Sequence, residues 1–304
     1  MKKSLLFLLS LMIFFMAGCQ NSQTNKNATD QKTSEQTRIY HAENGDIKVP
    51  AHPKRVIVLS GFTGNVLKLG VPVVGAESWS KNAPYLSKQL KDAKEVSEDD
   101  LEGIIALNPD LIIALSTVKN LNKLQKIAPT VVYTWGKLDY LDQHIEIGKL
   151  LNKEKQATDW VNSFKKDAEQ TGQAIRQKIG ENATVSVIEA YGKDLYVYGD
   201  NWARGTELLY QTMKLNMPEK VKADALKNGY FALSTEVLPE YMGDYVILSK
   251  YHEADLSFEQ TATYQNIPAV KNHHVFTMQG EGASFNDPIT LEKQLAFFKK
   301  SFLG

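Results

Sequence analysis

A long amphipathic segment near the middle of the chain, residues 154–179, most constrains how this sequence can fold. Its larger apolar side chains recur roughly one helical turn apart: Trp160, Val161, Phe164, Ala168, Ile175 and Ile179. Gly180 follows directly, and glycine is typical of a helix end. The segment predicts the longest helix of the chain, with a separately folded half on each side of it.

Short apolar runs alternate with helical segments in both halves. Before the long helix we expect strands at residues 55–60, 71–75, 110–115 and 130–133, and helices at residues 65–69, 101–107, 121–127 and 141–151. After it we expect strands at residues 184–189, 195–198 and 245–248, and helices at residues 206–213 and 291–302. This alternation predicts an α/β fold class with largely parallel strands, in two α/β lobes joined by a single long backbone helix. Clefts between lobes are favoured ligand sites.

The first 19 residues have the character of a bacterial lipoprotein signal peptide. Two lysines precede an apolar run, residues 4–15, which is shorter than the roughly 20 residues needed to span a bilayer. Small residues then precede the only cysteine, Cys19, in a pattern that resembles a lipobox. We expect cleavage before Cys19 and lipid attachment to its thiol. An ordinary secretory signal and an uncleaved membrane anchor are the alternatives.

The composition excludes several classes of function. The 304 residues include 35 Lys and Arg against 35 Asp and Glu, and nucleic-acid binding requires a basic excess, so no nucleic-acid partner is expected. The signature motifs of serine hydrolases, P-loop proteins and zinc proteases are absent from the sequence. The pair Asp99-Asp100 is interpreted as the N-terminal cap of a helix. We therefore do not expect an enzyme.

The six histidines show no spacing typical of metal ligands. No two of them lie four residues apart on one predicted helix, and no cysteine accompanies them. His273 and His274 precede a strand, where adjacent side chains point to opposite faces. Because a metal site needs several converging histidines and carboxylates, we predict no metal held directly by the protein and no cofactor.

The segment 194–207 carries most of the functional information. Trp202 and Arg204 fall in the turn between a predicted strand and a predicted helix, where side chains are often functional. From the residues alone, a structural interpretation is equally open: Trp202 would pack under the helix, and Arg204 would form a surface ion pair.

The segment resembles the signature Tyr-Gly-x-x-(Trp/Phe)-(Gly/Ala)-Arg-Gly of ferric hydroxamate-binding lipoproteins. These belong to the class III substrate-binding proteins for ferric siderophores and cobalamin. Four further stretches are similar to the same family and appear in the same order: His52-Pro-Lys-Arg-Val56, Leu107-Asn-Pro-Asp-Leu-Ile112, Ile127-Ala-Pro-Thr-Val131 and Asn286-Asp-Pro-Ile289. The resemblance covers residues 38–304.

The resemblance implies the class III periplasmic-binding-protein fold, with a shallow cleft between the lobes and small movements on binding. By this resemblance, Arg204 contacts the hydroxamate oxygens around the iron. The aromatic side chains that would pack on the siderophore are Trp202, Tyr196 and Trp135, with Phe62 and Phe285 as further candidates. Ser284 departs from the family pattern, because a tryptophan can stand at this place.

The chemistry of the ligand agrees with these residue types. A ferric trihydroxamate is nearly neutral and already surrounds its iron with oxygen, so the protein needs aromatic area and a directed donor. A ferric tris-catecholate carries roughly −3 charge and would favour several basic residues. The single arginine of the signature segment, Arg204, therefore favours a hydroxamate ligand over a catecholate. Binding of a catecholate or carboxylate siderophore remains an alternative, as does binding of haem with Met278 or Tyr264 as axial ligand. An exported enzyme or an adhesin on the same scaffold is an alternative from another class of function.

The resemblance also implies partners and a location. Glu102 in the first lobe and Glu236 in the second are the carboxylates expected to dock on arginines of an ABC permease, which works with its ATPase. We expect a monomer, anchored by lipid to the outer face of the cytoplasmic membrane, in a Gram-positive cell. The expected division is a signal peptide at 1–19, a flexible tether at 20–37, a first lobe at 38–152, a connecting helix at 153–180 and a second lobe at 181–304.

Overall fold

An antiparallel hairpin that the sequence did not predict opens the described part of the chain, residues 36–304 of the computed structural model. Its strands are β1 (Thr37–Ala42) and β2 (Gly45–Pro50). β1 thus begins at the last residue assigned to the tether. The predicted signal peptide, with Cys19, and residues 20–35 of the tether lie outside the described residues.

A five-stranded sheet forms the centre of the first lobe, in the order β5-β4-β3-β6-β7. All its paired strands are parallel, as predicted. The strands are β3 (Val56–Leu59), β4 (Val73–Ala76), β5 (Lys94–Glu95), β6 (Leu111–Leu115) and β7 (Thr130–Tyr133). Of this sheet, only the short β5 was not predicted. The apolar side chains of β3 and β6 are mostly buried, which explains their continuous hydrophobic runs.

Helices follow the strands of this lobe in alternation. They are α1 (Thr63–Lys68), α2 (Ser78–Asn82), α3 (Leu101–Ala106), α4 (Leu121–Ile127) and α5 (Tyr140–Leu150). Asp100 caps α3 by accepting a hydrogen bond from the N–H of Gly103 at 2.9 Å, which confirms the interpretation of the acidic pair. Asp139 caps α5 in the same way.

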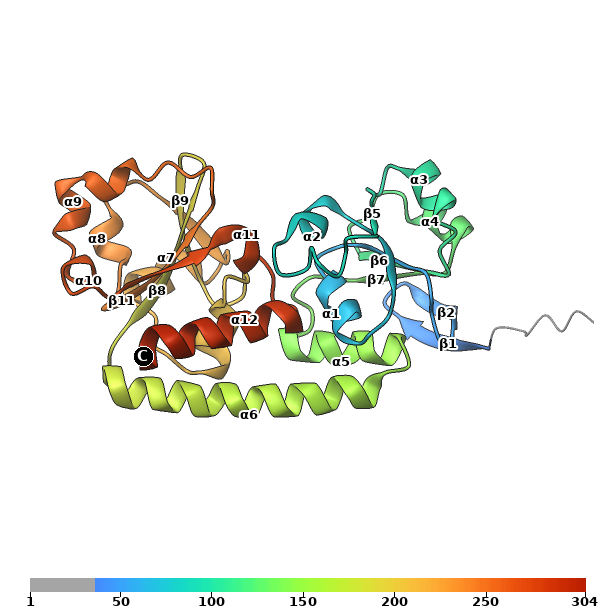
Figure 1. Ribbon diagram of the computed structural model, residues 1–304, viewed down its shortest axis with the longest axis horizontal. Helices are drawn as coiled ribbons and strands as arrows, with labels where there is room; N and C mark the ends of the chain where they lie inside the picture. Colours follow the sequence, from blue (N-terminus) through green and yellow to red (C-terminus); the bar gives the residue numbers. More distant parts are fainter. Residues whose placement is uncertain (1–35) are drawn as a thin grey trace, which may run out of the picture. The chain divides into compact units, whose positions relative to one another are not determined.

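The helix α6 (Glu154–Ile179) confirms the predicted long helix at both ends. Its 26 residues extend for about 39 Å. The buried face carries Val161, Phe164, Ala168 and Ile175, and Gly180 ends the helix with a positive φ of 103°. Figure 1 shows α6 passing along both lobes, so it fixes one lobe to the other.

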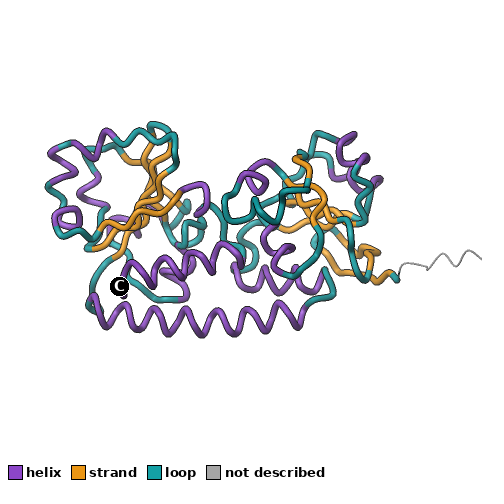
Figure 2. Tube along the Cα trace, viewed as in Figure 1, coloured by secondary structure: helices purple, strands orange, loops and turns teal. Residues whose placement is uncertain are grey.

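The second lobe contains a mixed five-stranded sheet in the order β10-β9-β8-β11-β12. Its strands are β8 (Val185–Tyr191), β9 (Asp194–Tyr198), β10 (Tyr230–Leu233), β11 (Tyr245–Lys250) and β12 (Val275–Gln279). β8, β11 and β12 are parallel, whereas β9 is antiparallel to both of its neighbours, β8 and β10. Both sheets are enclosed by helices and loops (Figure 2).

The helices of the second lobe are mostly short. They are a π-helical segment (Glu207–Thr212), α7 (Glu219–Ala225), α8 (Leu238–Tyr241), a 3-10 turn (Ser257–Gln260), α9 (Ala262–Gln265), α10 (Pro268–Lys271), α11 (Gly280–Ala283), α12 (Pro288–Phe298) and a final π-helical turn (Lys299–Leu303). The predicted helices at 206–213 and 291–302 are present, but part of each is wound as π-helix. Among residues 36–304, no helix combines the length and the hydropathy needed to cross a membrane.

The start of α12 joins the two lobes. The buried Asp287 caps this helix, and it lies so close to α1 that a Cβ atom at Gly64 would be 2.0 Å from its carboxylate. One turn further, Glu292 accepts hydrogen bonds from Lys68 of α1 (2.6 Å) and from Trp160 of α6 (2.7 Å). Three helices from different parts of the chain therefore meet at this point, which limits how far the lobes can move apart.

Candidate functional site

Arg204 lies in a sharp turn that follows β9. Ala203, Arg204 and Gly205 all have positive φ values, 58°, 54° and 79°. This left-handed conformation costs a residue with a side chain about 1–2 kcal/mol. The N–H of Arg204 donates to the carbonyl of Ala283 at 2.8 Å, which holds the turn against α11. At Gly205 a Cβ atom would lie 2.6 Å from the ring of Phe298, so only glycine fits there.

A buried carboxylate orients the Arg204 side chain. Nε of Arg204 donates to Oε2 of Glu189, and Nη2 donates to Oε1, both at 2.8 Å. The hydroxyl of Tyr198 donates to Oε1 of Glu189 at 2.8 Å, and that of Ser249 donates to Oε2 at 2.9 Å. The guanidinium also lies 4.6 Å from the centre of the Tyr198 ring. Glu189 is thus saturated by donors, and the guanidinium has one preferred orientation.

The charge of the guanidinium is stable, and part of the side chain is exposed. Burial alone would lower the pKa of Arg204, but the ion pair with Glu189 raises it above its usual value. The third hydrogen bond of the guanidinium runs from Nη1 to the carbonyl of Trp202 at 3.1 Å. Within residues 36–304 no acceptor takes its remaining N–H groups, and 15% of the side chain is exposed. The arrangement can donate hydrogen bonds to a polarised oxygen of a ligand.

Aromatic side chains surround Arg204 on the second lobe. Trp202 is 40% exposed and packs edge-on against Tyr230, with ring centres 5.2 Å apart. Tyr230 also contacts Tyr196 at 5.9 Å. Gly229 makes this packing possible, because a Cβ atom there would lie 1.7 Å from the Trp202 indole. The predicted Trp202 and Tyr196 therefore lie together. Sequence reasoning missed Tyr230, although the aromatic run after Gly229 was a usable signal.

The opposite wall of the cleft belongs to the first lobe. Trp135 follows β7, is 41% exposed and stacks on Phe62, with ring centres 5.8 Å apart and planes inclined by 24°. Phe62 is almost fully buried and also meets the edge of Tyr133. Trp135 therefore offers the ligand surface, while Phe62 mainly fixes its orientation.

Phe285 and Ser284 differ from the other candidates. Phe285 is buried and packs with Ala76 and Leu86 in the core of the first lobe, so it contributes little free surface to the cleft. The hydroxyl of Ser284 is hydrogen-bonded to the hydroxyl of Tyr251 and donates to the carbonyl of Gly280 at 2.9 Å. Position 284 is thus closed by a polar contact to Tyr251.

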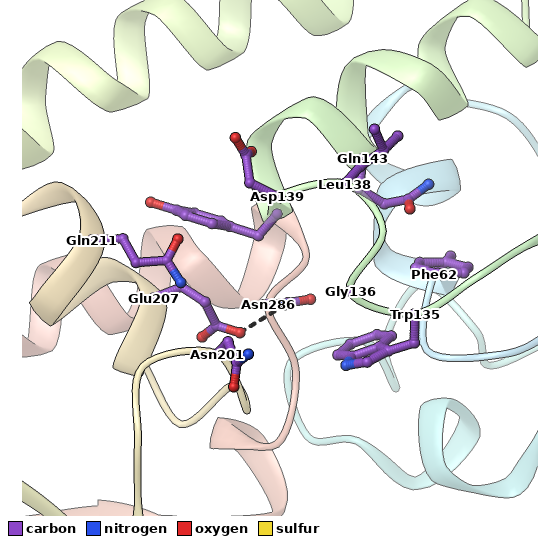
Figure 3. A pocket seen from close by; sticks show the side chains of 11 residues that line it. Phe62, Trp135, Gly136, Leu138, Asp139, Gln143, Asn201, Glu207, Gln211 and Asn286 are labelled. Atoms are coloured by element: carbon purple, nitrogen blue, oxygen red, sulfur yellow. Dashed lines mark hydrogen bonds between the residues drawn. The ribbon is translucent and has the colours of Figure 1, made fainter. Parts of the chain in front are cut away.

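A cavity of about 230 Å³ lies between the two lobes, beside Trp135 (Figure 3). Arg204, Trp202 and Tyr230 are not among the residues that line it. Phe62 and Trp135 border it from the first lobe, and Asn201, Glu207 and Asn286 border it from the second. The other lining residues are Gly136, Leu138, Asp139, Tyr140, Gln143 and Gln211. The lining is therefore rich in hydrogen-bonding groups, and it includes two carboxylates and no lysine or arginine.

Glu207 is a buried carboxylate at the base of this cavity. It accepts hydrogen bonds from the N–H of Ala203 (3.0 Å), from the side-chain amide of Asn286 (3.0 Å) and from the hydroxyl of Thr206 (3.1 Å). Burial raises the pKa of Glu207 above its usual range. These contacts connect the Arg204 turn to the segment before α12.

A second cavity of about 230 Å³ lies between α2 and the second lobe. On its wall, His252 meets two carboxylates: Nδ1 is 2.7 Å from Oε1 of Glu281 and 2.8 Å from Oε2 of Glu253. Nothing in the sequence indicated this group, because Glu281 is distant along the chain. The prediction that the protein holds no metal directly stays a prediction. His252 and Glu253 are exposed, and Glu281 is partly buried.

The two residues considered as haem ligands are not available to a ligand in the cleft. Tyr264 is buried in a cluster with Phe258 and Leu238. Met278 is buried in the cluster that contains Leu295 and Val187. Neither side chain lines either cavity.

The two carboxylates expected to dock on a permease lie on the surface of different lobes. Glu102 is exposed in the first turn of α3. Glu236 is exposed just before α8, and hydrogen bonds from Ser234 and Thr235 lower its pKa, so it is ionised at neutral pH. Each lobe therefore presents one exposed negative charge at the predicted place.

Two α/β lobes on a long connecting helix, with an aromatic cleft and a fixed arginine, define a substrate-binding protein. Residues 56–281 match the periplasmic binding protein family, and the chain belongs to this family of non-enzymatic substrate-binding proteins. The iron(3+)-hydroxamate-binding protein FhuD of Bacillus subtilis strain 168 is 35% identical over 303 residues, which cover 97% of this chain and 96% of that protein. Two relatives from the same organism that are 28% identical, YhfQ and YfiY, are described as lipoproteins.

Solved structures show the same architecture. The FhuD protein from S. pseudintermedius superimposes with a TM-score of 0.80 at 33% identity, over 88% of this chain and 99% of that one. FhuD2 from Staphylococcus aureus with bound ferrioxamine B gives a TM-score of 0.78 at 31% identity, over 83% of this chain and 98% of that one. The predicted class III fold of two lobes and a connecting helix is confirmed.

Proposed function

We propose that this protein captures a ferric hydroxamate siderophore outside the cell and delivers it to an ABC permease for iron uptake. The observation that carries this proposal is the Arg204 guanidinium, which is held at two points by Glu189 and lies beside a cluster of aromatic rings. Hydroxamate oxygens around Fe³⁺ are polarised acceptors, and the free N–H groups of Arg204 are suitable donors. Trp202, Tyr230 and Trp135 supply rigid apolar area for the organic part of the ligand.

The charge of the cleft favours hydroxamate over catecholate. The positive charge of Arg204 is compensated by Glu189, and the cavity beside Trp135 is lined by Asp139 and Glu207 without a basic residue. A ferric tris-catecholate with roughly −3 charge would lose hydration without gaining compensating partners. A nearly neutral ferric hydroxamate avoids that penalty. Relatives named for hydroxamate binding or solved with ferrioxamine B support the same ligand class.

Anchoring and delivery complete the proposed role. The lipobox-like sequence before Cys19 supports lipid attachment at this residue, with residues 20–35 as part of a tether. Glu102 and Glu236 would orient the loaded protein on arginines of the permease, because exposed charge pairs mainly set orientation and association rate.

Intrinsic tryptophan fluorescence of the purified protein tests the ligand class. Two of the four tryptophans, Trp135 and Trp202, border the proposed site, so an iron complex bound there should quench them. Parallel titrations would use ferrioxamine B, ferrichrome, a ferric catecholate and haemin. We expect saturable quenching by the hydroxamates only.

Variants locate the site. Arg204→Ala should weaken hydroxamate binding by about 1.5–3 kcal/mol, because a charged donor is lost. Arg204→Lys should recover little of the lost hydroxamate affinity, because an ammonium group cannot reproduce the two-point contact with Glu189. Tight binding of the catecholate or haemin alone would disprove the ligand assignment, and unchanged titrations of both variants would disprove the site.

A further inference from the structure

The second cavity is open to solvent and is lined by residues of both lobes. We name it the α2 cavity. The first lobe contributes Ser78, Trp79, Asn82 and Ala83, and the second contributes Tyr191, Tyr251, His252, Glu253 and Glu281. None of these residues is predicted from the sequence to contact a ligand. The contacts proposed for the ferric hydroxamate core do not involve the α2 cavity.

The α2 cavity adjoins the Arg204 site through two neighbouring strands. On β8, Glu189 and Tyr191 are two residues apart, so their side chains lie on the same face, separated by about 7 Å along the strand. Tyr251 directly follows β11, two residues after Ser249, which donates a hydrogen bond to Glu189. A ligand whose iron-bound oxygens lie at Arg204 can therefore extend a short flexible chain into the α2 cavity.

The polar wall of the α2 cavity is negatively charged. It carries Glu253 and Glu281 with no lysine or arginine, and His252 lies between the two carboxylates. The backbone N–H of His252 also donates to Oε1 of Glu281 at 2.9 Å, which fixes that carboxylate. Oε2 of Glu281 is shielded from solvent and has no hydrogen-bond partner within residues 36–304. A buried carboxylate oxygen without a donor is costly, and a cationic donor would satisfy it.

The other walls of the α2 cavity are aromatic. Trp79 is 54% exposed and comes from the first lobe, while Tyr191 is 42% exposed and comes from the second. Tyr191 packs edge-on against Tyr251, with ring centres 4.9 Å apart. Aromatic faces of this kind attract an ammonium group and also bury the methylene groups that carry it.

We propose that the α2 cavity is a subsite for the protonated primary amine at the end of a flexible arm of a linear ferric hydroxamate. This inference rests on the proposed function, and it narrows the ligand from ferric hydroxamates in general to linear ones with a free amine. Glu253 and Glu281 bind the ammonium group, and Trp79 and Tyr191 enclose the methylene chain.

His252 occupies the place of the ligand cation when the cavity is empty. Its hydrogen bond to Glu281 and the charge of Glu253 raise the pKa of His252. The ligand ammonium therefore competes with the imidazole for the same carboxylates. Removing the imidazole in His252→Gln, which keeps the backbone contact to Glu281, should strengthen binding of an amine-bearing ligand about twofold to fivefold.

Calorimetric titration of the full chain in detergent micelles tests the subsite with two ligands that share one iron core. The first is ferrioxamine B, which ends in a primary amine, and the second is its N-acetylated form, which has no ammonium. We expect the wild-type protein to prefer ferrioxamine B. The double variant Glu253→Gln/Glu281→Gln should weaken ferrioxamine B binding about threefold to tenfold and leave the acetylated ligand unchanged.

A matched control is Glu240→Gln on α8, which removes an exposed charge of the second lobe outside both cavities. It should bind both ligands like the wild type, and thermal unfolding should show that all variants are folded. Equal affinity of wild type and double variant for each ligand would overturn the amine subsite while the proposed function stands. Equal weakening for both ligands would also overturn it, because the carboxylates would then act on the whole cleft. Failure of the wild type to bind either ligand would overturn the proposed function and the subsite together.

Discussion

Glu189 and Arg204 form a two-point ion pair inside the second lobe, with both N–O distances at 2.8 Å. The carboxylate comes from the middle of β8, whereas the guanidinium comes from a strained turn 15 residues later. Because Tyr198 and Ser249 saturate the carboxylate, the guanidinium cannot rotate without losing several charged hydrogen bonds. Arg204 is therefore oriented before the ligand arrives, which reduces the entropy lost on binding.

Replacing the carboxylate by an amide should damage both stability and binding. Glu189→Gln leaves the buried guanidinium without its counter-charge, and breaking a buried pair in this way costs about 3 kcal/mol or more. Urea unfolding should show this loss, and ferrioxamine B affinity should fall about tenfold as Arg204 loses its orientation. Ser249→Ala is the control, since it removes one neutral donor and should cost only about 1 kcal/mol. Equal effects of the two variants would argue against the ion pair as the orienting contact.

Gly229 controls the position of Trp202. Its φ is +85°, and a Cβ atom would overlap the indole at 1.7 Å, so Gly229→Ala must displace the ring. We expect ferric hydroxamate binding to weaken about tenfold and stability to fall by about 2 kcal/mol.

A control for backbone strain alone is Gly45→Ala in the β1–β2 hairpin. Gly45 has a φ of +108°, and a Cβ atom there would meet no other atom within 4 Å, so the variant carries strain without collision. This variant should lose stability but keep its affinity. Normal binding by Gly229→Ala would show that the position of Trp202 does not matter for the ligand.

The sequence predicted those parts of the fold and site that depend on local patterns. The apolar residues of the α6 segment recur with the period of a helix, so this helix could be predicted. Trp202 and Arg204 were noticed because a turn between a strand and a helix does not require either residue type. Glu189 could not be found in this way, since it lies in an apolar strand run where a carboxylate has no visible partner. The α2 cavity could not be predicted from the sequence either. Trp79 and Glu281 both line it, but they come together only when the two lobes pack.

The buried His144 should make stability depend on pH. Burial, together with the nearby charge of Lys68, lowers its pKa to about 4, whereas an unfolded histidine titrates near about 6.5. Between these values the unfolded chain binds a proton that the native protein does not. The contribution of His144 to stability is therefore complete above a pH of about 6.5 and is lost as the pH falls towards about 4.

The variant His144→Asn isolates this effect, because buried acids with shifted pKa values also make stability depend on pH. Glu207 and Asp287 have raised pKa values and act in the opposite direction, so only the difference between two proteins is informative. The asparagine amide can still reach Asn65, which is 3.0 Å from Nδ1 of His144. From a pH of about 7 to about 5, the wild type should lose about 2 kcal/mol relative to the variant in urea unfolding. A constant difference would mean that the pKa of His144 in the native protein equals its value in the unfolded chain.

Glu102 and Glu236 should affect delivery without affecting capture. Both are exposed, and neither lines the cavity beside Trp135 or the α2 cavity. The double variant Glu102→Lys/Glu236→Lys should bind ferric hydroxamate with wild-type affinity, whereas iron uptake by cells that depend on it should fall at least about tenfold, because like charges would face the permease. Each single variant should lose less iron uptake, since one of the two expected contacts with the permease remains. Normal uptake by the double variant would place the permease contact elsewhere, and weakened binding would show that these carboxylates influence the cleft itself.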